Sequence, residues 1–196
     1  MSIVQRRRAP ARVLLCAPLV FLACGAGPVA AASPCAGGTP TIELRIVASG
    51  IAPDLDRTTV IQVHDDGCAQ VHRPAYRRDA GEYRLDLDLA ALGALRGRVD
   101  RPALRNFDAK RVRSELAAAD KKAAEAGAVV QSEPDGDYYE LRWFSAGKAA
   151  SAGWAGLPAA AARYDNATLK QMADAAQALE ALAGRSGAVR IDGGTP

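Results

Sequence analysis

The sequence predicts an α+β fold: an antiparallel sheet built from two hairpins plus flanking strands, covered by two or three helices and closed by a single disulfide. In the first half of the chain, segments alternate apolar and polar residues, as half-buried strands do. Short turn sequences separate these segments and join neighbours into hairpins. In the second half, apolar residues recur at the three- or four-residue spacing of an amphipathic helix.

A β-hairpin is predicted in the first half of the chain. Residues 58–64 and 68–73 are rich in strand-forming residues and flank a three-residue loop whose last residue is Gly67. Such a loop ends in the left-handed backbone conformation, which glycine adopts without strain. The loop sets the register, in which His72 lies opposite Val60 and the apolar residues of both strands share one face.

Strands are also expected before and after this hairpin. Residues 41–48 alternate between apolar and polar side chains, and residues 82–89 do so most clearly, with acidic and basic residues on the polar face. A second hairpin is predicted from residues 128–132 and 138–144, because the Pro134 turn between them has the composition of a type I turn. Residues 189–191 are expected to add an edge strand.

Helices are predicted for residues 89–97, 108–126 and 168–182. Asp108 is placed to cap the second helix, and Gly127 to end it. Thr168 and Gln171 have the spacing of a capping box at the start of the third helix. We expect the second and third helices to lie on the sheet.

The composition divides the chain into five segments. Within the segment rich in alanine and glycine, residues 145–165, Trp154 is expected to be an anchor against the core. The segments are residues 1–32, a signal peptide; 33–144, the main α+β domain; 145–165, a flexible Ala/Gly-rich connection; 166–191, a C-terminal helix packed on the same domain; and 192–196, a disordered tail.

Residues 1–32 have the pattern of a cleaved export signal, in which basic residues precede an apolar segment and small residues lead to Ala32. The apolar segment has about a dozen residues, whereas a membrane-spanning helix needs about 20. We therefore expect cleavage between Ala32 and Ser33, general secretion, and a periplasmic or secreted protein without a transmembrane segment in the mature chain. A lipoprotein anchored at Cys24 is the alternative.

Two of the four cysteines lie in the signal, which leaves Cys35 and Cys68 in the mature chain. An even pair in an oxidising compartment favours a disulfide. The bridge would close a loop of roughly 34 residues and fix the mature N-terminus. Two free thiols are the alternative; a metal site on them is not expected, because the chain has no C-x-x-C motif and only two histidines.

The charge balance does not favour a nucleic-acid partner. Loss of residues 1–32 removes four arginines and no acidic residue, so 25 basic and 22 acidic residues become 21 and 22. The mature protein is then close to neutral, and its charges alternate in sign. The basic stretch at residues 96–113 is interpreted as a solvated helix face, with a carboxylate-rich partner as the alternative. We expect no cofactor and no metal.

No catalytic site is predicted. His64 and His72 lie on the polar face of the hairpin, roughly 13 Å apart at about 3.3 Å per residue, so they cannot share one zinc ion. Ser145 and Lys148 match the S-x-x-K motif of serine-active penicillin-recognising enzymes, but the helix and the K-T-G strand that this chemistry needs are not indicated. We expect a protein that is not an enzyme. The candidate partner-contact residues are Trp154, Tyr138, His64 and His72.

The order of elements and two short motifs resemble the emfourin-type small inhibitors of thermolysin-like metalloproteases. The motifs are Ser49-Gly50 after the first strand and Asp135-Gly136-Asp137-Tyr138-Tyr139 in a later one, and the resemblance extends over residues 41–182. It implies an inhibitor or binding module and transfers no particular residue. The prediction is an exported, non-catalytic protein-binding module, with inhibition of an exported protease as its specific form. The alternatives are a small exported hydrolase and a cell-envelope accessory protein or lipoprotein of unknown activity.

Overall fold

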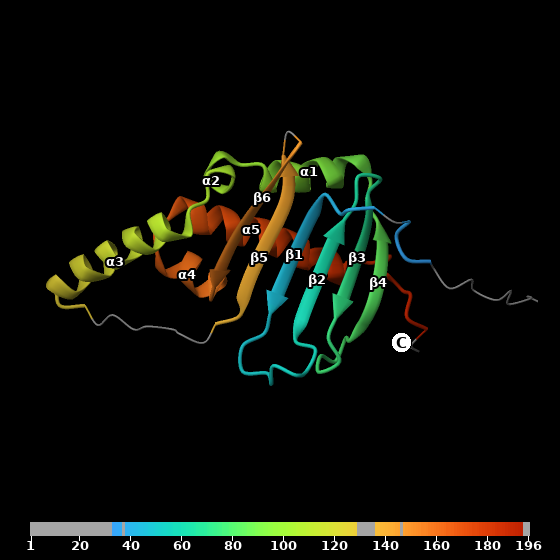
Figure 1. Ribbon diagram of the computed structural model, residues 1–196, viewed down its shortest axis with the longest axis horizontal. Coiled ribbons are helices and arrows are strands. Elements are labelled where there is room, and N and C mark those ends of the chain that lie inside the picture. Colours follow the sequence, from blue (N-terminus) through green and yellow to red (C-terminus); the bar gives the residue numbers. More distant parts are fainter. Residues whose placement is uncertain (1–32, 37, 129–135, 146, 194–196) are drawn as a thin grey trace, which may run out of the picture. The chain divides into compact units, whose positions relative to one another are not determined.

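A computed structural model describes residues 33–36, 38–128, 136–145 and 147–193. In this part of the chain one seven-stranded antiparallel sheet has the strand order β6-β5-β1-β2-β3-β4-β7 (Figure 1). The strands are β1 (Ile42–Val47), β2 (Thr58–Val63), β3 (Cys68–Arg73), β4 (Gly81–Asp86), β5 (Tyr138–Ser145), β6 (Lys148–Ala155) and β7 (Val189–Arg190). The helices are α1 (Leu89–Val99), α2 (Pro102–Arg105), α3 (Ala109–Glu125), α4 (Leu157–Arg163) and α5 (Ala167–Glu180), followed by the 3₁₀ turn η1 (Ala181–Gly184). The predicted α+β class is confirmed.

The hairpin of β2 and β3 has the predicted register. Val60 lies opposite His72, and the residue pairs from there to the turn place the apolar residues of both strands on one face. Gly67 ends the loop with φ of 86°, and a Cβ there would lie 2.6 Å from the carbonyl oxygen of Leu87. Both the conformation and the space therefore require glycine. The predicted disulfide between Cys35 and Cys68 is also present, with 5.8 Å between the Cα atoms.

One face of the sheet is buried beneath helices. Alternate residues of the central strands lie on this face, with Leu44, Ile61 and Leu141 fully buried. Helix α5 contacts β5, α1, α2 and α4 and lies behind the sheet in the view of Figure 1. The regular alternation of the strands thus separates a buried face from a polar face.

The predicted second hairpin is wrong, because β5 pairs with β1 on one side and with β6 on the other. Of the segment predicted to pair with it, residues 129–132 lie outside the described residues, as does the Pro134 turn. The small side chains of β6 explain why it pairs with β5: Ala150 lies opposite Trp143, and Ala152 lies opposite Leu141. Small residues beside large ones fill the layer without overpacking it.

The expectation of a flexible connection over residues 145–165 is therefore also corrected. These residues contain β6 and α4, and Trp154 packs against the core while remaining partly exposed. A strand composed mainly of alanine and glycine is not recognised from its sequence, because side chains of nearly equal size show no alternation of apolar and polar residues.

Several helix predictions need correction at their ends. Leu89 begins α1 but is 85% exposed, and the buried face of α1 begins at Leu92. Asn166, rather than Thr168, caps α5 by accepting a hydrogen bond from the backbone N–H of Leu169. Helix α3 does not lie on the sheet: Val112 is its one buried residue, and most of the helix extends beyond the β6 edge (Figure 1).

The ends of the described chain lie at the other edge of the sheet. The predicted edge strand near the C-terminus is confirmed as β7, which pairs with β4. The carbonyl oxygen of Ser33 accepts a hydrogen bond from Arg84 of β4 at 2.9 Å. The predicted signal peptide, residues 1–32, and the last three residues of the predicted tail lie outside the described residues. Within the described ranges, no helix has both the length and the apolar character needed to cross a membrane.

Candidate functional site

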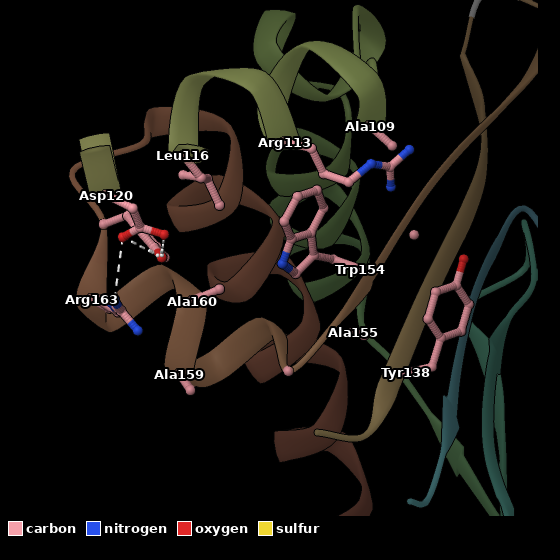
Figure 2. A pocket seen from close by; sticks show the side chains of 13 residues that line it. Ala109, Arg113, Leu116, Asp120, Tyr138, Trp154, Ala155, Ala159, Ala160 and Arg163 are labelled. Carbon is pink, nitrogen blue, oxygen red and sulfur yellow. Dashed lines mark hydrogen bonds and ion pairs between the residues drawn. The ribbon is translucent and has the colours of Figure 1, made fainter. Parts of the chain in front are cut away.

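A cleft of about 540 Å³ opens at the β6 edge of the sheet. Strand β6 forms one wall, and helices α3 and α4 form the others (Figure 2). We call this space the edge cleft. The lining residues on which its chemistry depends are Arg113, Asp120, Tyr138, Gly153, Trp154 and Arg163.

Two aromatic side chains lie on opposite sides of β6. Trp154 pairs with the buried Tyr139 across the β5–β6 ladder, so its indole is on the helix-covered side. Tyr138 precedes Tyr139 and therefore points to the other side, as Figure 2 shows. A Cβ on Gly153 would lie only 2.1 Å from the hydroxyl oxygen of Tyr138. The glycine thus makes the room in which the Tyr138 ring lies across the edge strand.

A second close approach fixes the end of β6 against the start of β5. A Cβ on Gly136 would lie 2.4 Å from the Cα atom of Gly156, and the N–H of Gly156 donates to the carbonyl of Asp137 at 2.8 Å. Gly156 has φ of 61° and turns the chain into α4, which contributes Ala159 and Ala160 to the cleft. The cleft owes its volume to these small residues.

An ion-pair group forms the polar wall of the cleft. Asp120 of α3 accepts a hydrogen bond from the hydroxyl of Tyr164 at 2.9 Å and pairs with Arg163 at 3.2 Å. The Arg163 guanidinium also lies 5.0 Å from the centre of the Tyr164 ring. Burial and the hydrogen bond to Asp120 raise the pKa of Tyr164, so the phenol stays protonated as a donor. These contacts link α3 to α4.

Arg113 is the cation of the cleft that has no acidic partner among the residues described. It is exposed on α3, and Figure 2 shows its side chain extending from α3 above Trp154. The neighbouring carboxylate of Asp120 is already engaged with Arg163 and Tyr164. The cleft therefore presents an unmatched positive charge beside an aromatic ring.

His72 takes part in a different group, on the polar face of the sheet. Its Nε2 lies 2.8 Å from Asp56, and its Nδ1 lies 2.5 Å from Glu82. Burial lowers the pKa of His72, but the hydrogen bonds and charges of Glu82 and Asp56 outweigh burial, and the net pKa is raised. The two carboxylates meet opposite nitrogens of one ring, so they do not converge on a common metal position. Within the described part of the chain, no group of three ligating side chains is arranged to hold a metal ion.

The residues considered for hydrolysis lie at two strand turns. The hydroxyl of Ser145 donates to Asp100 at 2.5 Å, and Lys148 lies opposite Ser145 where β5 turns into β6. The S-x-x-K residues therefore occupy a strand turn, not the start of a helix. His64 lies at the β2–β3 turn, where its backbone N–H donates to the carbonyl of Cys68.

The structure brings together two of the four predicted partner-contact residues. Trp154 and Tyr138 line the edge cleft, whereas His64 and His72 belong to the β2–β3 hairpin, separated from β6 by β5 and β1. The predicted cleavage residue Ala32 lies outside the described residues. Sequence reasoning included Arg113 only in the basic stretch 96–113, interpreted as a solvated helix face, and missed Asp120 and Arg163. Residues far apart in the chain meet only after α3 and α4 have been placed.

Comparison of this chain with protein-family models, with curated proteins and with solved structures finds no match. The geometry of the cleft and the sequence signals are therefore the basis for a functional proposal.

Proposed function

We propose that this protein is an exported, non-catalytic protein-binding module and that it holds its partner at the edge cleft. The observation that carries the proposal is the cleft itself, in which Trp154 and Tyr138 flank an edge strand of small residues. Aromatic side chains present a large, rigid contact area and are common in the energetically dominant positions of protein interfaces.

The sequence supports the export part of the proposal. Residues 1–32 have the composition of a secretory signal, and the pairing of Cys35 with Cys68 suits an oxidising compartment. Inhibition of an exported protease is the specific form of binding that we propose, and its support is the sequence resemblance to small metalloprotease inhibitors.

Affinity capture tests the binding part of the proposal. Residues 33–196, with the disulfide formed, are immobilised and exposed to periplasmic extract or culture fluid, and retained proteins are identified by mass spectrometry. We expect a protein that the wild type retains and a Tyr138→Ala/Trp154→Ala variant does not. Phe144→Ala is the matched control, because Phe144 is 51% exposed on β5 and does not line the cleft. Equal retention by all three proteins, or retention of none, would overturn the proposal.

A separate measurement tests the inhibitor form. The purified mature protein is titrated against a panel of exported metalloproteases, and we expect complete inhibition of at least one at a stoichiometric ratio. If capture succeeds but no protease is slowed, the inhibitor form is rejected and the binding function stands.

A further inference from the structure

We infer that the edge cleft binds its partner by strand addition: an extended segment of another protein pairs with β6 and places a carboxylate beside Arg113. This inference rests on the proposed function and specifies the chemistry of the partner. Its support comes from the backbone of β6, the two sides of the cleft and the charge of Arg113.

The backbone of β6 has one free edge. Residues 148, 150, 152 and 154 direct their N–H and C=O groups at β5, because the N–H of Gly156 bonds to Asp137 and the pattern alternates along an antiparallel ladder. The groups of Ala149, Ser151, Gly153 and Ala155 therefore point away from β5. The strand order ends at β6, so no strand in the described ranges pairs with these groups.

Side chains do little to protect this edge. Strand β6 has the sequence KAASAGWA, with its one charge at the start and no proline, whereas exposed edges are commonly blocked by charged side chains, prolines or bulges. Ala149, Ser151 and Ala155 are exposed. An extended peptide can therefore approach the outward-facing groups and form main-chain hydrogen bonds with them.

The cleft suits the alternating side chains of such a peptide. Successive residues of an added strand point to opposite faces of the sheet. On one face they meet Trp154 and the small residues of α4, and on the other they meet Tyr138. The first side has room for an apolar side chain, because Ala159 and Ala160 leave space beneath the indole.

The positive charge of Arg113 favours an acidic residue in the added strand of the partner. Arg113 has no acidic partner among the residues described, and Asp120 is held by Arg163 and Tyr164. A carboxylate on the added strand would satisfy the charge of Arg113, and charge complementarity contributes chiefly to specificity and to the association rate. A second copy of this chain fits less well, since β6 itself contains no acidic residue.

The test is a selection from a phage-displayed library of random ten-residue peptides on the mature protein. We expect enriched peptides with an apolar residue near an aspartate or glutamate. Synthetic copies should bind Arg113→Glu about tenfold or more weakly than wild type. They should bind the control Arg111→Glu about as well as wild type, because Arg111 lies two residues before Arg113 on α3 and does not line the cleft. Enrichment of basic peptides, or of none, would overturn the inference.

Backbone pairing is tested separately. Ser151→Pro removes an outward-facing donor without removing a bond to β5, and prolines are tolerated at strand edges; Ser151→Thr keeps the donor and is the control. We expect the proline variant to lose binding about tenfold or more. If it does not fold, N-methylation of alternate amides of the peptide tests the same bonds on the wild-type protein. Binding that survives both changes would overturn strand addition.

These outcomes separate the inference from the function on which it rests. If the captured partner depends on Trp154 but is retained by Ser151→Pro and Arg113→Glu, the module binds proteins by another mode and only the inference fails. If the wild type forms a dimer that Ser151→Pro converts to a monomer, the occupant of the edge is a second copy and the acidic partner is rejected.

Discussion

The two edges of the sheet are built in opposite ways. At one edge, β7 has two residues, and its Arg190 forms an ion pair at 2.6 Å with Asp192, which follows the strand. At the other edge, β6 has eight residues, of which Lys148 alone is charged. A short edge strand with charged side chains disfavours pairing with other chains, whereas a long edge strand with few charges leaves its backbone groups available for pairing. We call these the closed edge and the open edge.

The elements that stabilise the chain ends lie near the closed edge. The bridge between Cys35 and Cys68 ties the N-terminal segment to β3, and the His72 group links β3 and β4 to the loop before β2. The open edge carries the aromatic residues and the unmatched charge. Under the proposed function, the open edge is the binding surface and the closed edge holds the contacts that stabilise the chain ends, and variants at each edge test this division.

Removal of the disulfide should have the largest effect on stability. A Cys35→Ala/Cys68→Ala variant of the mature protein frees a loop whose ends are 33 residues apart, and the unfolding free energy should fall by about 3 to 4 kcal/mol on the loop-entropy model. Urea unfolding measures the change, with reduced wild type as the control. If the unfolding free energy decreases by less than about 1 kcal/mol, the closed edge does not depend on the disulfide.

Filling the space at Gly153 should affect the open edge. Gly153→Val places atoms where the Tyr138 hydroxyl lies, so the ring must move, and we expect a loss of about 1 kcal/mol together with loss of partner binding. Ser151→Val, on the same face of the same strand, is the matched control. The combination of Tyr138→Ala with Gly153→Val should recover the lost stability, and a failure to recover would contradict the assigned contact.

The His72 group should stabilise the closed edge in a pH-dependent way. The pKa of His72 is raised above its ordinary value of 6.5, so its protonated form binds Asp56 and Glu82 more favourably in the folded protein. This contribution is fully present below about pH 6.5 and is lost as the pH rises through the higher folded pKa. His72→Gln should therefore destabilise the protein more at low pH than at high pH. The difference should be less than about 1 kcal/mol, because a third to a half of each side chain in the group is exposed.

Unfolding curves of wild type and His72→Gln at several pH values measure this difference. His64→Gln serves as the control, since His64 has no carboxylate bound to its ring in the described part of the chain. A difference between wild type and His72→Gln that grows with pH would contradict the assignment.

The smallest effect is expected from removal of β7. A chain that ends at Ala188 loses the pairing with β4 and the hydrogen bond from Ile191 to the carbonyl of Glu82. We expect an unchanged unfolding midpoint but faster amide exchange at Glu82, whose N–H donates to Asp192. Exchange measured by mass spectrometry reports this, and an unchanged exchange rate would show that β7 does not close the edge.

Prediction from sequence succeeded where local patterns were strong. The β2–β3 register follows from a three-residue loop ending in Gly67, and the cysteine pair followed from count and compartment. Prediction failed where side chains are of similar size and polarity. Residues 148–155 show no alternation of apolar and polar residues, so the sequence predicts a connection where the structure has β6. Because its true partner was missed, β5 was assigned to the wrong hairpin.

The candidate site divides in the same way. Trp154 and Tyr138 stood out as large aromatic residues, one of them in an Ala/Gly-rich segment. Arg113 was one of many basic residues, and its lack of a partner depends on which acidic residues α3 and α4 bring near it. No spacing in the sequence indicates that.

Local patterns were enough to specify the α+β class, the central hairpin and the cysteine pairing, because alternation, turn chemistry and the number of cysteines can be read directly along the chain. The strand order, the open edge and the cleft arise from long-range packing. These depend on which small residues pack beside Trp143 and Leu141, and on charges that meet only after folding. Complementarity between distant segments is a property of the packed molecule, and it is there that the candidate binding site is formed.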